Sequence, residues 1–275
     1  MPSIRRILIA MALSFLLPVT GLTDEKPDLQ ALIKQVRLLR DVKPRVRVIE
    51  EIGKIGQDAK EASQVLVEAA AERSPMIRQA ALDALEKVNP PLHKPVVALL
   101  VDNMKRYEAV DELTGLSEEA KPALPLLLAM LKNELASPNR ERPGVGGSLS
   151  LGSKLLTAMV KIAPEDKAVL QAVLDAITFK GPGGVGKASA QSVSDVRATA
   201  IDLSLDDLKL DPKLHTKALM SAINDIYCRV KAIHALGELG EKAKDAIPTL
   251  KKLKLDMDES IRNAATAALE KIEGK

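Results

Sequence analysis

Aromatic residues are almost absent from this sequence. Its 275 residues include no Trp, two Phe and two Tyr, although 46% of the chain is hydrophobic and 28% is charged. An enzyme of this length rarely builds its core without aromatic side chains, whereas stacked helices rich in small residues do so routinely. The scarcity of aromatics therefore favours an all-α protein and leaves few platforms on which sugars or bases could stack.

Cysteine is nearly as rare. The single thiol, Cys228, excludes an internal disulfide, so the hydrophobic core must hold the fold, and we expect the thiol itself to be buried in a helix. The histidines His93, His215 and His234 share no metal-ligand spacing, and no Ser/His, Cys/His or paired-carboxylate site can be defended. The sequence therefore predicts no catalytic residue, no metal and no cofactor, and we expect a protein that is not an enzyme.

Residues 1–23 are predicted to form a signal peptide. Two arginines precede the apolar run Ile7 to Leu17, and Pro18 and small residues follow it. The run is about half as long as the ~20 residues of a membrane span. We expect cleavage near Gly21 or Thr23 and a periplasmic or secreted protein, and an uncleaved segment would act as an anchor. Cleavage leaves a nearly neutral chain, which does not favour nucleic-acid binding.

Two distant segments of the chain repeat each other. Residues 52–88 align without a gap with residues 236–272, and Gly53, Gly56 and Arg78 are among the residues that recur. A third copy begins at Leu116. Apolar residues within each unit are spaced i, i+3, i+4, i+7, which is the pattern of an amphipathic helix. Each unit therefore predicts two helices.

Each predicted helix has its own sequence marker. The first helix of a unit begins near Ala-x-x-Ala, and the second begins around an arginine that is followed by Ala-Leu; these arginines are Arg45, Arg78, Arg106, Arg197, Arg229 and Arg262. An aspartate lies four residues before four of them, at Asp41, Asp102, Asp225 and Asp258. We expect these aspartates and arginines to pair along the stack.

These residues resemble HEAT repeats, in particular the short, Ala-rich type also seen in phycobilisome-lyase-like repeats. The resemblance covers about residues 28–273. It implies an armadillo-like, right-handed α-solenoid of about seven HEAT-like helix pairs over residues 24–275, acting as a monomeric scaffold that binds another protein. The fourth unit departs most, because Gly152 occupies the arginine position and Ser117 replaces a turn glycine. The alternative is a lyase-like or accessory factor that holds a small molecule or tetrapyrrole, against which the export signal counts.

Two Gly-rich stretches, residues 136–150 and 180–194, interrupt the repeats. Both fall between the two predicted helices of consecutive units, so we expect two insertions that emerge side by side on one edge. Their cations, Arg140, Arg142, Lys180 and Lys187, are candidate partner-binding residues. The alternative is that the stretches are tolerated surface insertions, because lengthening a loop costs little free energy.

The second stretch also carries the spacing of a phosphate-binding loop, with Gly181, Gly186 and Lys187. Such a loop requires a β-strand before it and a Ser or Thr after the lysine. Here a predicted helix precedes the glycines and Ala188 follows the lysine, while residues 189–195 are interpreted as a polar linker. The sequence therefore does not predict a nucleotide site.

The exposed face of the second helices offers another candidate surface. The resemblance implies that second helices line the concave side, with an acidic column of Glu50, Asp83, Asp111 and Asp202 and with His234 beside it. These five residues are candidate contacts for a protein partner. The alternative is a solvated face on which pairs such as Glu50 with Lys54 support single helices.

Overall fold

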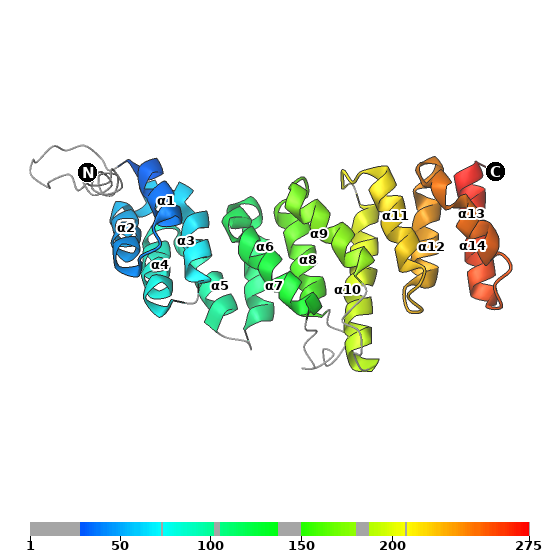
Figure 1. The fold of residues 1–275 in the computed structure, drawn as a ribbon, viewed down its shortest axis with the longest axis horizontal. Coiled ribbons are helices and arrows are strands. Elements are labelled where there is room, and N and C mark those ends of the chain that lie inside the picture. The colour runs from blue at the N-terminus through cyan, green and yellow to red at the C-terminus, as the bar shows by residue number, and fades with distance from the viewer. Residues whose placement is uncertain are drawn as a thin grey trace, which may run out of the picture.

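The structure is a computed structural model that describes residues 28–72, 74–101, 105–136, 150–179, 187–206 and 208–274, with the backbone alone for residues 187–193. These residues form α-helices and short 3-10 helices and contain no strand. Figure 1 shows the helices as one elongated array, with the first and last helices at opposite ends. The prediction of an all-α solenoid is confirmed.

The described α-helices follow one another as seven pairs. The pairs are α1 (Leu29–Leu38) with α2 (Val42–Ile55), α3 (Ser63–Ala70) with α4 (Pro75–Val88), α5 (Pro90–Val101) with α6 (Arg106–Leu116), α7 (Leu124–Ala136) with α8 (Leu151–Ile162), α9 (Lys167–Thr178) with α10 (Lys187–Leu205), α11 (Pro212–Ala222) with α12 (Arg229–Glu238), and α13 (Ile247–Leu253) with α14 (Glu259–Glu273). Several helices begin at an Asp or Ser whose side chain accepts backbone N–H groups, as Asp166 and Asp211 do. Such a cap stabilises a helix by about 1 kcal/mol.

Three links between pairs are 3-10 helices that carry the Ala-x-x-Ala marker: η2 (Gly56–Ala62), η3 (Ser117–Ala123) and η4 (Gly240–Ala246). Both alanines of each link are fully buried. Gly56 and Gly240 begin their links with φ of 70° and 54°, and Ser117 takes the same place with φ of 49°. Ser117 therefore bears the backbone strain that glycine avoids at the equivalent links.

The recurring glycines of the second helices allow close packing. A Cβ atom on Gly53 would lie 3.1 Å from Ala84 Cα, and one on Gly237 would lie 3.0 Å from Ala268 Cα. Helices α2 and α4, and likewise α12 and α14, therefore approach almost to backbone contact. Gly152, at the arginine position of α8, leaves room for a side chain instead, since a Cβ there would lie 2.7 Å from Val196 Cγ2 of α10.

The recurring arginines act mainly within their own pair. They donate to backbone carbonyls at the end of the preceding first helix, as Arg106 does to Leu99 O (3.2 Å), Arg197 to Ile177 O (3.0 Å) and Arg229 to Ile223 O (2.9 Å). Arg78 and Arg262 make equivalent bonds. The arginine thus satisfies carbonyls that a helix end leaves without an intrahelical partner.

The predicted pairing of aspartate with arginine is confirmed between Asp225 and Arg197, which join the sixth pair to the fifth. It is wrong for Asp258, which caps α14 by accepting from Ser260 N instead. Arg45 pairs with Glu72 rather than with an aspartate, at 2.5 Å. Asp102 lies outside the described residues. An aspartate just before a helix is well placed to cap it, and this local bond competes with pairing between units.

The third pair departs from the regular arrangement. Only Asn89 separates α4 from α5, whereas a seven-residue 3-10 helix stands at three other links. With so short a link, α5 cannot turn back to the row of first helices, and it packs on α4 and α6. As a result, α3 contacts η3 and α7 directly.

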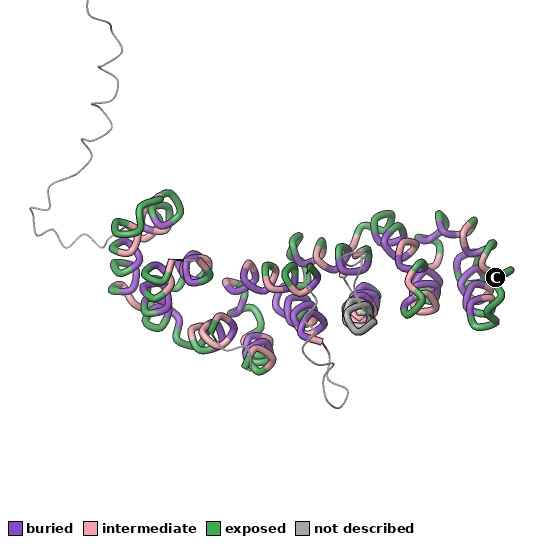
Figure 2. The backbone as a smooth tube through the Cα atoms, turned by 60° about the horizontal axis from the view of Figure 1, so that its bottom comes forward, coloured by how far each residue is buried: buried purple, intermediate pink, exposed green. Residues whose placement is uncertain are grey.

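Two rows of unequal length result. One row holds α1, α3, α7, α9, α11 and α13, and the other holds the second helices together with α5. Because the longer row must lie outside, the array bends toward the first helices at the third pair, and Figure 2 shows this bend in the N-terminal half. The expectation that second helices line the concave side is therefore wrong at the bend.

Candidate functional site

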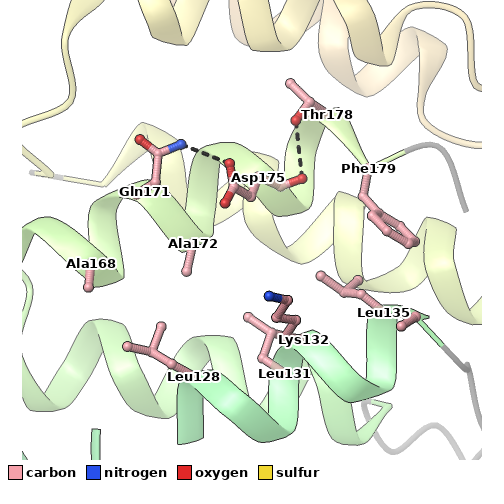
Figure 3. Close-up of a pocket in the computed structure, with 11 residues that line it drawn as sticks. Leu128, Leu131, Lys132, Leu135, Ala168, Gln171, Ala172, Asp175, Thr178 and Phe179 are labelled. Carbon is pink, nitrogen blue, oxygen red and sulfur yellow. Dashed lines mark hydrogen bonds between the residues drawn. The ribbon is translucent and has the colours of Figure 1, made fainter. Parts of the chain in front are cut away.

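A groove separates the first helices of the fourth and fifth pairs, α7 and α9. It has a volume of about 740 Å³. Leu128, Leu131 and Leu135 rise from α7 on one side, and Ala168 and Ala172 of α9 point into the gap from the other (Figure 3). The two alanines are small, and of the three leucines Leu128 is half-buried, whereas Leu131 and Leu135 are buried.

The groove is apolar inside and polar at its rim. Gln171 Nε2 donates to Asp175 Oδ1 at 2.7 Å, and Thr178 Oγ1 donates to Leu174 O at 3.1 Å. Lys132 and Asp175 are both exposed, so the rim offers charges of both signs. An apolar floor with a few polar groups around it is the usual make-up of a binding site.

The two Gly-rich stretches begin at one end of this groove. Ala136 ends α7 and Phe179 follows α9, and both residues line the groove. Residues 137–149 and 180–186, with the candidate cations Arg140, Arg142 and Lys180, lie outside the described residues. That the two stretches emerge side by side stays a prediction.

The predicted insertion at residues 180–194 is shorter than expected. Helix α10 begins at Lys187, so the interpretation of the residues after it as a polar linker is wrong. Alanine is the best helix former, and Ala188 and Ala190 favour a helix at these positions. The helix α9 stands where a phosphate-binding loop would need a strand, which agrees with the rejection of a nucleotide site.

The predicted acidic column is partly neutralised by lysines of the next second helix. Asp111 pairs with Lys154, Asp202 pairs with Lys231 at 2.6 Å, and the equivalent Glu238 pairs with Lys271 at 2.6 Å; the three pairs link α6 to α8, α10 to α12 and α12 to α14. The lysine hydrogen bond lowers the pKa of Glu238. This face is therefore a ladder of ion pairs between units, and exposed pairs of this kind stabilise a fold only weakly.

The remaining members of the column lie singly on the same face. Asp83 accepts a 2.7 Å hydrogen bond from Gln79 within α4. Glu50 and His234 are exposed on α2 and α12. The structure thus keeps the predicted residues on one row of helices without bringing them together into a cleft.

A second groove, of about 720 Å³, lies on the inner side of the bend. Gln64 of α3, Pro125 of α7 and Asp166 of the α8–α9 link are among its lining residues. Lys60 is another lining residue, and its Nζ lies 3.7 Å from Glu119 Oε2. This groove has mixed charge, in contrast to the apolar groove between α7 and α9. Sequence reasoning missed both grooves, because their walls come from helices far apart in the chain.

A buried histidine and serine also meet where the sequence showed no constellation. His215 Nε2 lies 2.8 Å from Ser204 Oγ, and Ser204 Oγ donates to Ile201 O at 2.7 Å. The serine therefore accepts its hydrogen bond from the imidazole and is not activated as a nucleophile. Burial lowers the pKa of His215 to about 4, which keeps it neutral. This is a structural contact at the α10–α11 link.

Cys228 is buried as predicted, although it is the residue before α12 rather than a residue within a helix. Its Sγ donates to Ser194 O at 3.3 Å, and burial raises the pKa of the thiol. Among the described residues, no cluster of His, Cys, Asp and Glu could hold a metal ion. No described helix is long and apolar enough to cross a membrane.

Comparisons with known proteins add little to this description. No family model matches the chain, and no curated protein matches it. An engineered protein aligns with 90% of this chain and 98% of its own at 16% identity, with a TM-score of 0.31. A designed armadillo repeat protein in complex with a (KR)4 peptide aligns with 89% of this chain and 99% of its own, at 17% identity and a TM-score of 0.32. Superpositions this loose carry no conclusion, and the repeat fold follows from the helix pairs themselves.

Proposed function

We propose that this chain is an exported, non-catalytic scaffold that binds an apolar segment of another protein in the groove between α7 and α9. The observation that carries the proposal is the apolar floor that Leu128, Leu131 and Leu135 form opposite the two short side chains of α9. Export rests on the predicted signal peptide at residues 1–23.

The shape of the groove favours a peptide segment. Its leucines lie at positions i, i+3 and i+7 of one helix, so the apolar floor runs along the helix axis. Grooves of this kind receive an amphipathic helix or strand that lays its apolar face between the walls. Lys132 and Asp175 at the rim can orient such a segment through its polar flank.

The test fills the groove. Ala172→Phe places a large ring between α7 and α9, and Ala129→Phe adds the same ring to an exposed position of α7 that does not line the groove. Both variants are expected to keep their helical circular dichroism. The three proteins are then used as baits in a cross-linked pull-down from the extracytoplasmic fraction.

The proposal expects one partner that wild type and Ala129→Phe capture and that Ala172→Phe loses. Capture of the same partner by Ala172→Phe, or no specific capture by any bait, would contradict it. Visible absorbance by a bound chromophore in the purified wild type, lost in Ala172→Phe, would instead assign the groove to a small molecule, the alternative that the repeat type suggests.

A further inference from the structure

Most of the exposed apolar side chains lie along one edge of the array. We call the turns within helix pairs the intra-pair edge, and the links between successive pairs the inter-pair edge. In Figure 1 the intra-pair turns from α5 onward lie along the lower edge, and the inter-pair links lie along the upper edge. Eight of the ten large hydrophobic residues that are exposed in the described part lie on the intra-pair edge: Leu38, Val42, Met76, Val101, Ile226, Tyr227, Leu255 and Met257. The two others, Leu205 and Leu214, flank an inter-pair link.

These side chains protrude from the turns. Met257 is 100% exposed, Leu255 86% and Ile226 74%. They are spread along the array on separate turns, whereas the anchors of a protein interface gather in one compact, well-packed patch. A row of protruding tips fits a deformable, extended surface better than it fits a folded partner.

The aromatic residues follow the same edge. The three in the described part are Tyr107 in the first turn of α6, Phe179 at the end of α9 and Tyr227 in the turn before α12. All three lie next to intra-pair turns, but only Tyr227 is exposed, whereas Tyr107 and Phe179 are half-buried against the core. Tyrosine is enriched where proteins meet the water interface of a lipid bilayer, because its ring is apolar and its hydroxyl is polar.

Charge separates the two edges as well. Together with four residues of each flanking helix, the seven intra-pair turns carry four more Lys and Arg than Asp and Glu among the side chains that the structure describes. The six inter-pair links, with the same flanks, carry three more Asp and Glu than Lys and Arg among the described side chains. The edge that exposes apolar side chains is therefore also the cationic one.

We propose that the intra-pair edge docks onto the surface of an anionic lipid bilayer. The protruding residues Ile226, Leu255 and Met257 enter the interface, and nearby cations such as Lys252 and Lys254 face the lipid headgroups. Apolar insertion combined with attraction to anionic lipid is the usual basis of binding at a membrane surface. The inference goes beyond the proposed function, because none of Ile226, Leu255 and Met257 lines the groove between α7 and α9.

The experiment compares two variants of the protein with wild type. The edge variant carries Ile226→Ser, Leu255→Ser and Met257→Ser, and the control variant carries Leu205→Ser and Leu214→Ser on the opposite edge. All five positions are exposed, so both variants are expected to match wild type in circular dichroism and thermal melting. All three proteins share the same N-terminus, so any contribution of residues 1–27 is common to them.

Binding is measured by co-sedimentation with vesicles of phosphatidylglycerol and phosphatidylcholine and with vesicles of phosphatidylcholine alone. Wild type and the control variant are expected to bind the anionic vesicles. The affinity of the edge variant for these vesicles is expected to be lower by a factor of about ten or more. Lack of binding by wild type, or equal binding by the edge variant, would overturn the proposal. Loss of a protein partner by the edge variant, without vesicle binding by wild type, would assign the edge to a protein.

The two proposals fail independently. Ala172→Phe is expected to keep vesicle binding while it loses the groove partner, and the edge variant is expected to keep the groove partner. If one substitution set removed both activities from a folded protein, the separation of the two surfaces would be wrong.

Discussion

The two edges of the solenoid are built in different ways. On the inter-pair edge, the 3-10 links bury both alanines of their marker, and Gly56 and Gly240 adopt the positive φ that starts each link. On the intra-pair edge, the turns expose Leu255, Met257 and Ile226 to solvent. One edge is fixed by packing between neighbouring pairs, whereas the other presents apolar side chains to solvent.

The largest expected effect comes from an intra-pair turn that a buried ion pair stabilises. Arg197 and Asp225 are both almost completely buried and join α10 to the turn before α12. Arg197→Ala leaves the carboxylate buried without its partner, and we expect a loss of about 3–5 kcal/mol in the free energy of unfolding. Urea denaturation measures this loss. The matched control is Arg262→Ala, whose arginine bonds only carbonyls and whose removal is expected to cost about 1 kcal/mol.

An equal and small effect of both substitutions would mean that the ion pair does not hold the turn. Replacing both partners, Arg197→Met with Asp225→Leu, is expected to restore most of the stability, because no unpaired charge then remains buried.

Acid is expected to weaken the inter-pair edge at the α10–α11 link. Burial lowers the pKa of His215 to about 4, whereas an unfolded histidine titrates near 6.5. Between these values the unfolded chain binds more protons, so stability falls as the pH is lowered from about 6.5 towards 4, by on the order of 1–2 kcal/mol. Melting temperatures measured across this range check the loss.

The control for the pH prediction is His215→Gln, which keeps a hydrogen-bond donor near Ser204 and removes the titration. Its stability should change less between pH 7 and pH 4.5 than that of wild type, even if it is less stable at neutral pH. An unchanged pH dependence would show that other groups control the acid sensitivity.

A smaller effect is expected at η3, the link whose first residue is not glycine. Ser117 has φ of 49°, and Ser117→Gly relieves this strain. We expect a gain of about 1 kcal/mol, and the reverse change Gly240→Ser should cost a similar amount. Chemical denaturation of both variants tests the pair, and a loss of stability in Ser117→Gly would show that the serine side chain contributes more than the strain costs.

The fold was readable from the sequence because packing between units constrains particular residues. Gly53 and Gly237 recur since a Cβ at either position would lie only 3.0–3.1 Å from the backbone of the next second helix, and the marker alanines recur at positions that are fully buried in the links. In the sequence, Ser117 stands where the equivalent links have a glycine, and the structure shows that it adopts the same positive φ.

Other features depend on three-dimensional relations that a repeat pattern does not encode. The short link at Asn89 places α5 in the outer row, although its sequence has helical periodicity like any first helix. The groove arises because Ala168 and Ala172 lie opposite the leucines of α7. The sequence of neither helix indicates which helix lies opposite it. The arginines bond carbonyls rather than most of the predicted aspartates, because the backbone acceptors are closer once the pair has folded.

Hydrogen–deuterium exchange of the protein, with and without anionic vesicles, tests the division between the two edges most directly. The account predicts that vesicles slow exchange in the intra-pair turns at residues 223–228 and 254–258 and leave the inter-pair link at residues 239–246 unchanged. Slower exchange at that link, or no change at the intra-pair turns, would contradict it.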